Sequence, residues 1–71
     1  MNDIVLSVNG EPVRVAVGST IADLVTDLTQ EDDPKGVAVA VDRCVVPRSQ
    51  WASTQAREGS LVVVVSAAAG G

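Results

Sequence analysis

The sequence predicts an α+β domain in which a mixed sheet of four to five strands packs against one main helix. Short aliphatic stretches flank a single segment whose apolar residues repeat with helical spacing. The chain also has one Trp and no Phe or Tyr, so many small β-branched side chains must build its core, which favours strands. With 71 residues there is room for one small domain only.

Two strands joined by a turn open the chain. Apolar residues alternate with other residues in DIVLSV, residues 3–8, and alternate again over residues 13–17. Between them, Asn9 and Gly10 supply the positive φ angles of a tight hairpin turn, although the Glu-Pro that follows leaves a longer loop open. We therefore expect an antiparallel hairpin.

The next segment has helical spacing. Its apolar residues fall at i, i+3, i+4 and i+7, which predicts one buried stripe made of Ile21, Leu24, Val25 and Leu28. Ser19 or Thr20 is the expected N-cap, and Thr20 with Asp23 fits the capping-box pattern. Pro34 and Gly36 prevent the helix from continuing, and the acidic run 31–33 is expected to be a solvated loop.

The second half completes the sheet. VAVAV, residues 37–41, is expected to be a strand covered by the helix on one face and partly shielded on the other. CVV, residues 44–46, is a short edge strand before Pro47, and RSQWASTQ after it is a short helical or 3₁₀ connector. LVVVVS, residues 61–66, is apolar at both parities, which favours a central strand.

This order of elements predicts the fold. A central last strand would pair in parallel with the first, with the helix crossing one face of the sheet by a right-handed connection. That is the β-grasp, or ubiquitin-like, arrangement. Residues 1–66 would form the β-grasp domain, and residues 67–71, AAAGG, a flexible C-terminal tail.

Composition excludes several classes of function. The net charge is −4 and the basic residues are scattered, so nucleic acid is a poor partner and basic protein surfaces are better ones. Cys44 is the only cysteine, so no internal disulfide is possible and a cytoplasmic location is expected. The longest aliphatic run, residues 61–65, is too short to span a membrane.

Catalytic and metal-binding patterns are also missing. Without histidine, the chain has no Ser-His-Asp triad and no Cys-His pair, and it has no glycine-rich phosphate loop. The acidic run 31–33 lacks the spacing of a calcium loop, so no bound cofactor or metal is expected. Cys44 is expected to be a small buried hydrophobe or inert thiol, and Trp51 a packing residue rather than a ligand platform. Arg48 is either a surface charge or a docking contact.

The most distinctive chemical group is the α-carboxylate of Gly71. It is unreactive until another protein converts it, with ATP, to an acyl adenylate. Gly70 and Gly71 lack side chains and Ala69 has a small one, so this end can thread a narrow enzyme channel.

The fold order, VVPRSQWA at residues 45–52 and the terminal Gly-Gly together resemble the ThiS family, the ubiquitin-like sulfur carriers of thiamine biosynthesis. The resemblance spans essentially the whole chain. The Gly-Gly end is shared with ubiquitin-like modifiers and with the small subunit of molybdopterin synthase. Pro47, Arg48 and Trp51 point more narrowly to the thiamine branch.

The resemblance implies a carrier and cosubstrate, not an enzyme. A ThiF-type, E1-like adenylyltransferase would activate Gly71 with ATP and magnesium, and a sulfur donor protein would leave a C-terminal thiocarboxylate. A ThiG-type thiazole synthase would then receive the sulfur. Arg48 and Trp51 are candidate partner contacts, and the chain alone is expected to be a monomer.

Three other functions stay open from sequence. The chain could carry sulfur to molybdopterin or another acceptor. It could be a non-covalent ubiquitin-like binding module whose tail is inert. It could also be a small enzyme that uses Cys44.

Overall fold

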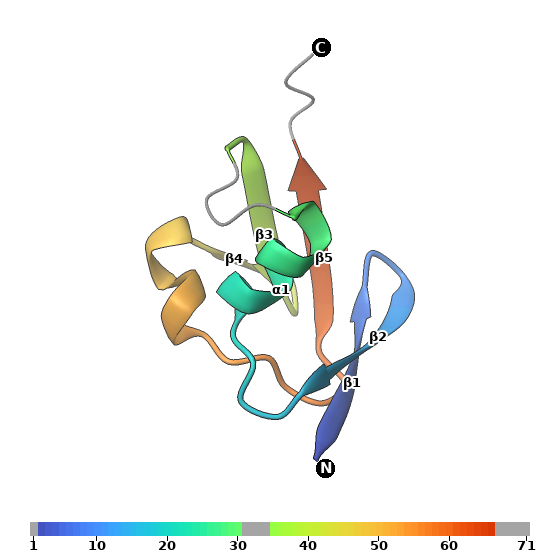
Figure 1. Cartoon of the computed structure of the whole chain (residues 1–71). Helices are drawn as coiled ribbons and strands as arrows, with labels where there is room; N and C mark the ends of the chain where they lie inside the picture. Colours follow the sequence, from blue (N-terminus) through green and yellow to red (C-terminus); the bar gives the residue numbers. More distant parts are fainter. Residues whose placement is uncertain (1, 31–34, 67–71) are drawn as a thin grey trace.

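A computed structural model describes residues 2–30 and 35–66. Within them, one sheet has the strand order β2-β1-β5-β3-β4, and helix α1 lies across one face of it (Figure 1). The strands are β1 (Asp3–Val8), β2 (Glu11–Ala16), β3 (Val37–Val41), β4 (Cys44–Val46) and β5 (Leu61–Ser66). The predicted α+β class and β-grasp order are confirmed.

The β1–β2 hairpin has a two-residue loop. Val8 pairs with Glu11, and Asn9 and Gly10 between them have φ angles of 52° and 87°. Two consecutive left-handed residues give the turn that matches the twist of a tight hairpin. The longer loop that the Glu-Pro pair left open does not form, because β2 is an edge strand, where a proline is tolerated.

Helix α1 spans Ile21–Thr29 and begins with the predicted capping box. The Asp23 backbone N–H donates to Thr20 Oγ1 over 3.2 Å, and the Thr20 N–H donates to Asp23 Oδ2 over 3.0 Å. Three of the four predicted stripe residues are buried, but Leu28 is 45% exposed. Leu28 lies in the last turn of the helix, past the buried residues of the stripe.

Strand β5 is central, as predicted. It pairs in parallel with β1, where Ser7 faces Leu61 and Val8 faces Val62. On its other side it pairs antiparallel with β3 as far as Val37 opposite Ser66. The short strand β4 pairs with β3 at the edge of the sheet, also as predicted.

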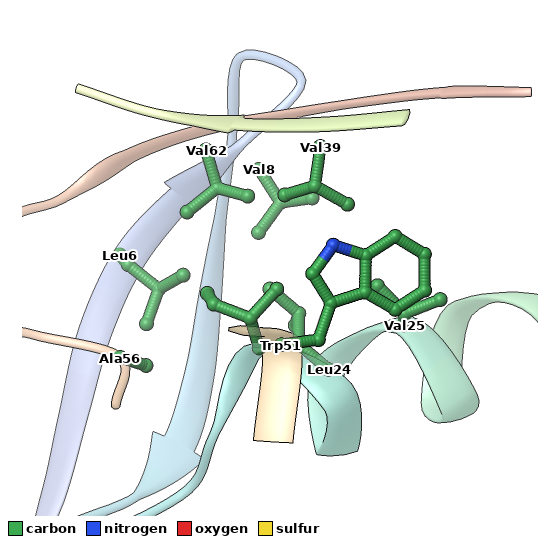
Figure 2. Close-up of a cluster of buried hydrophobic side chains, with 9 residues drawn as sticks. Leu6, Val8, Leu24, Val25, Val39, Trp51, Ala56 and Val62 are labelled. Carbon is green, nitrogen blue, oxygen red and sulfur yellow. The ribbon is translucent and has the colours of Figure 1, made fainter. Parts of the chain in front are cut away.

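The core lies between the sheet and α1. Figure 2 shows the buried cluster, in which Trp51 reaches from the 3₁₀ helix η1 (Arg48–Ser53) toward the sheet side chains. Its members are Leu6, Val8, Ile21, Leu24, Val25, Val39, Trp51, Ala56 and Val62. The prediction that Trp51 is a packing residue is therefore confirmed.

Exposure decides between two interpretations of Cys44, a small buried hydrophobe or an inert thiol. The first is wrong, because Cys44 is exposed on the short edge strand β4, beside the turn that enters it. On the face of the sheet opposite α1, β3 is partly shielded as expected, since Ala38 is exposed and Ala40 is half-buried, whereas Val63 and Val65 on β5 are exposed. No second layer of described residues covers that face.

Candidate functional site

The candidate site is the end of the sheet at which β5 finishes. The predicted reactive end, with Ala69, Gly70 and Gly71, lies outside the described residues, so the structure defines the support that precedes it. Strand β5 runs along the middle of the sheet to Ser66 (Figure 1). Because β1 and β5 are parallel, this end of β5 lies on the side of the sheet where β1 turns into β2.

An asparagine side chain ties the end of β5 to that turn. The Val64 backbone N–H donates to Asn9 Oδ1 over 2.9 Å, and Asn9 Nδ2 donates to the Val64 carbonyl over 3.2 Å. We call these two hydrogen bonds the Asn9–Val64 bridge. The Asn9 backbone N–H also donates to the Val62 carbonyl over 2.9 Å. Sequence reasoning gave Asn9 a turn role only, and missed the bridge.

An apolar surface lies on the face of the sheet that α1 leaves open. Its large side chains form the open-face patch, which consists of Val5, Val45, Leu61, Val63 and Val65. The register connects Val45 on β4 with Val63 on β5, because Ala40 pairs with both. Scattered exposed apolar residues are ordinary, but a connected group of them is typical of a surface that meets another molecule.

Arg48 and Trp51 form a pair on η1. Trp51 Nε1 donates to the Val46 carbonyl over 2.9 Å, which fixes the indole against the end of β4. Arg48 Cζ lies 5.2 Å from the centroid of the Trp51 ring, in cation–π range. Trp51 is buried and Arg48 is exposed, so Arg48 is the member of the pair that another protein can reach directly. A contact between either residue and a partner stays a prediction.

The comparison with protein families decides the relationship. The model of the ThiS family matches residues 6–71. The chain belongs to the ThiS family. The sulfur carrier protein ThiS of Escherichia coli (strain K12) is 32% identical over 63 residues, which are 89% of this chain and 92% of that protein. The resemblance expected from the sequence is confirmed.

A solved structure supports the ThiS fold. The crystal structure of the thiamine biosynthesis protein ThiS from Geobacter metallireducens has a TM-score of 0.75. The two sequences are 24% identical, and the superposition covers 96% of this chain and 100% of the Geobacter chain. At this identity the likeness shows the shared β-grasp fold.

Within residues 2–30 and 35–66 of this ThiS-family chain, no group of three or more His, Cys, Asp or Glu side chains could hold a metal ion. The acidic run 31–33 lies outside these ranges. No helix within the ranges has the length and apolar character needed to cross a membrane.

Proposed function

We propose that this chain is the sulfur carrier of thiamine biosynthesis and that it carries sulfur on the carboxyl group of Gly71. The observation that carries the proposal is the ThiS-family match, which extends from β1 to Gly71 and therefore includes the Gly-Gly residues. The fold supports it, because the central strand β5 leads directly into residues 67–71.

The first step is activation by a second protein. The Gly71 carboxylate attacks the α-phosphorus of ATP within a ThiF-type adenylyltransferase, pyrophosphate leaves, and a C-terminal acyl adenylate forms. ATP and magnesium belong to that partner's site. Glycines 70 and 71 suit this step because a chain without Cβ atoms can enter a channel that excludes side chains. From Ser66, five residues can extend at most about 17 Å.

The second step stores sulfur. Sulfur at the oxidation level of sulfide, delivered by a donor protein, attacks the acyl carbon, AMP leaves, and Gly71 ends in a thiocarboxylate. A ThiG-type thiazole synthase then takes the sulfur from this group. A nucleophile tethered to a docked protein acts at a high local concentration and is not lost as free sulfide. The chain is thus a cosubstrate that other proteins act on.

We assign docking of the adenylyltransferase to the open-face patch. Strand β5 contributes Leu61, Val63 and Val65 to the patch and also leads to Gly71. An enzyme that takes up the end of the chain therefore also lies over this part of the sheet. The apolar patch favours apolar contacts on the enzyme surface. The chain's net charge of −4 favours basic residues around those contacts.

An intact-mass experiment tests the proposal. The purified protein is incubated with the ThiF-type adenylyltransferase of the same organism, MgATP and a sulfur source. We expect its mass to rise by one exchange of oxygen for sulfur, located at Gly71 by fragmentation. A chain that lacks Gly70 and Gly71 is the matched control and must stay unchanged. Unchanged wild-type protein, with a second carrier active in the same mixture, would refute the proposal.

A genetic experiment separates the carrier from a non-covalent binding module. The full chain is expressed in Escherichia coli without its own ThiS, on medium without thiamine or thiazole. We expect growth with the full chain and none with the chain that lacks Gly70 and Gly71. Equal growth with both chains would favour a binding module. Growth with Cys44→Ala would exclude an enzyme that depends on Cys44.

A further inference from the structure

The two edges of β5 are held differently near its end. Along β3, backbone pairing continues as far as Ser66. Along β1, the paired residues end at Val62, because the chain turns away at Asn9 and Gly10. Past Val62, the edge of β5 that faces the hairpin therefore has no neighbouring strand.

The Asn9–Val64 bridge fills this gap. The carboxamide offers one acceptor and one donor to the N–H and carbonyl of Val64, two bonds that a continued parallel strand would supply from two different residues. The same residue has φ 52°, a left-handed conformation that Asn adopts more readily than most residues. Asn9 thus forms the turn and extends the ladder, whereas glycine would only form the turn and aspartate would lack the donor.

We infer that Asn9 is a positioning residue for adenylation of Gly71, an inference that rests on the function proposed above. With the enzyme on the open-face patch, the path from the docked face to Gly71 runs through the last residues of β5. Val64 is separated from Ser66 by one residue, so the bridge holds the hairpin-side edge of β5 close to the point at which the chain leaves the sheet, while β3 holds the other edge as far as Ser66. A shift of about 1 Å in a reacting group can lower a rate by roughly 100-fold.

The inference predicts a specific kinetic pattern. The open-face patch sets how well the carrier docks, and Asn9 is not part of it. Removing the bridge should therefore lower kcat for adenylation by about tenfold while KM changes by less than about twofold. If the variant were only less well folded, the apparent kcat would fall because less protein is active. Dividing by the folded fraction would then restore the wild-type kcat.

Three variants test this pattern. Asn9→Gly keeps the left-handed turn and removes the bridge. Asn9→Asp keeps the acceptor for the Val64 N–H and removes the donor, so its effect should be intermediate. Gln30→Gly is the matched control, because Gln30 also has a positive φ, 62°, and its side-chain amide donates to the Asp27 carbonyl over 2.7 Å, away from β5. Its kcat and KM should equal those of the wild type.

Two measurements are made on fully folded protein. Amide hydrogen exchange by NMR should be at least about tenfold faster at Val64 in Asn9→Gly and unchanged at Val39 in the core. Pyrophosphate release with the ThiF-type adenylyltransferase and MgATP gives kcat and KM. Unchanged Val64 exchange, or a kcat for Asn9→Gly equal to that of the wild type, would overturn the inference alone. If the wild-type chain is not adenylated, the proposed function fails as well, whatever Val64 exchange shows.

Discussion

Valine side chains lie on both faces of the sheet, but they have different roles on each face. On β5, Val62 is 0% exposed and contacts the core, whereas its neighbour Val63 is 40% exposed on the open face. The same contrast separates Val39 on β3, 1% exposed, from Val45 on β4, 76% exposed. Strands that are apolar at both parities thus need not be covered on both sides. The residues that face α1 stabilise the fold, and the residues that face away from it form an apolar surface on the strand that ends at Ser66.

The largest expected effect comes from Val62→Asp, which places a charge in the covered face. An isolated buried carboxylate costs several kcal/mol, against about 4 to 11 kcal/mol of total stability for 71 residues. We expect most of the protein to be unfolded at 25 °C by circular dichroism. A folded variant with wild-type stability would show that the two faces do not differ as described.

Val63→Asp is the matched change one residue along the strand. Because Val63 is on the open face, the variant should remain folded and lose about 1 kcal/mol of stability, the scale of strand propensity differences. Its kcat/KM for adenylation should fall at least tenfold, or about 1.4 kcal/mol, because a charge enters the docking surface. Urea unfolding and pyrophosphate release measure the two effects. Unchanged kcat/KM would remove the open-face patch from the docking proposal.

Thr20→Ala tests whether a change on the helix side of the sheet affects stability without affecting adenylation. It removes the Thr20 acceptor for the Asp23 N–H, so we expect a loss of about 1 kcal/mol in the free energy of unfolding. Adenylation by folded protein should not change, because the cap belongs to the covered side. Ser19→Ala is a suitable control, since Thr20 supplies the cap side chain. A specific loss of adenylation in Thr20→Ala would mean that partners also contact the helix side.

Arg48→Ala should have the smallest effect on stability, about 0.5 kcal/mol from the lost contact with Trp51. Urea unfolding followed by Trp51 fluorescence measures it. The same variant tests Arg48 as a partner contact at η1, outside the open face. A fall in kcat/KM for adenylation or for sulfur transfer to thiazole synthase would extend the docking surface beyond the sheet. Wild-type values in both reactions would exclude Arg48 as a partner contact.

Much of the fold could be predicted because local patterns determine it. The Asn9-Gly10 pair defines the hairpin, and the spacing of Ile21, Leu24 and Val25 defines the helix. Burial at particular positions was harder, because it depends on what packs against each residue. Leu28 continues the apolar stripe in the sequence but is exposed in the last turn of α1, and Cys44 is exposed at a sheet edge.

The candidate site could be predicted only in part. The spacing of Arg48 and Trp51 in a 3₁₀ connector brings them together, as the structure shows. The Asn9–Val64 bridge joins residues 55 positions apart, and nothing local to Asn9 distinguishes it from an ordinary turn residue. The role of Gly71 rests on the family relationship and on its chemistry, since it lies outside the described residues.

The parallel pairing of β1 with β5 has a consequence for synthesis in the cell. The first strand leaves the ribosome early, but its central neighbour is translated some 50 residues later, after several seconds at ordinary elongation rates. Until then β1 and β2 have only each other as paired strands, and a two-stranded hairpin is marginal in water. A chain that lacks β5 therefore cannot complete its sheet, because β5 joins the β1–β2 hairpin to the β3–β4 pair.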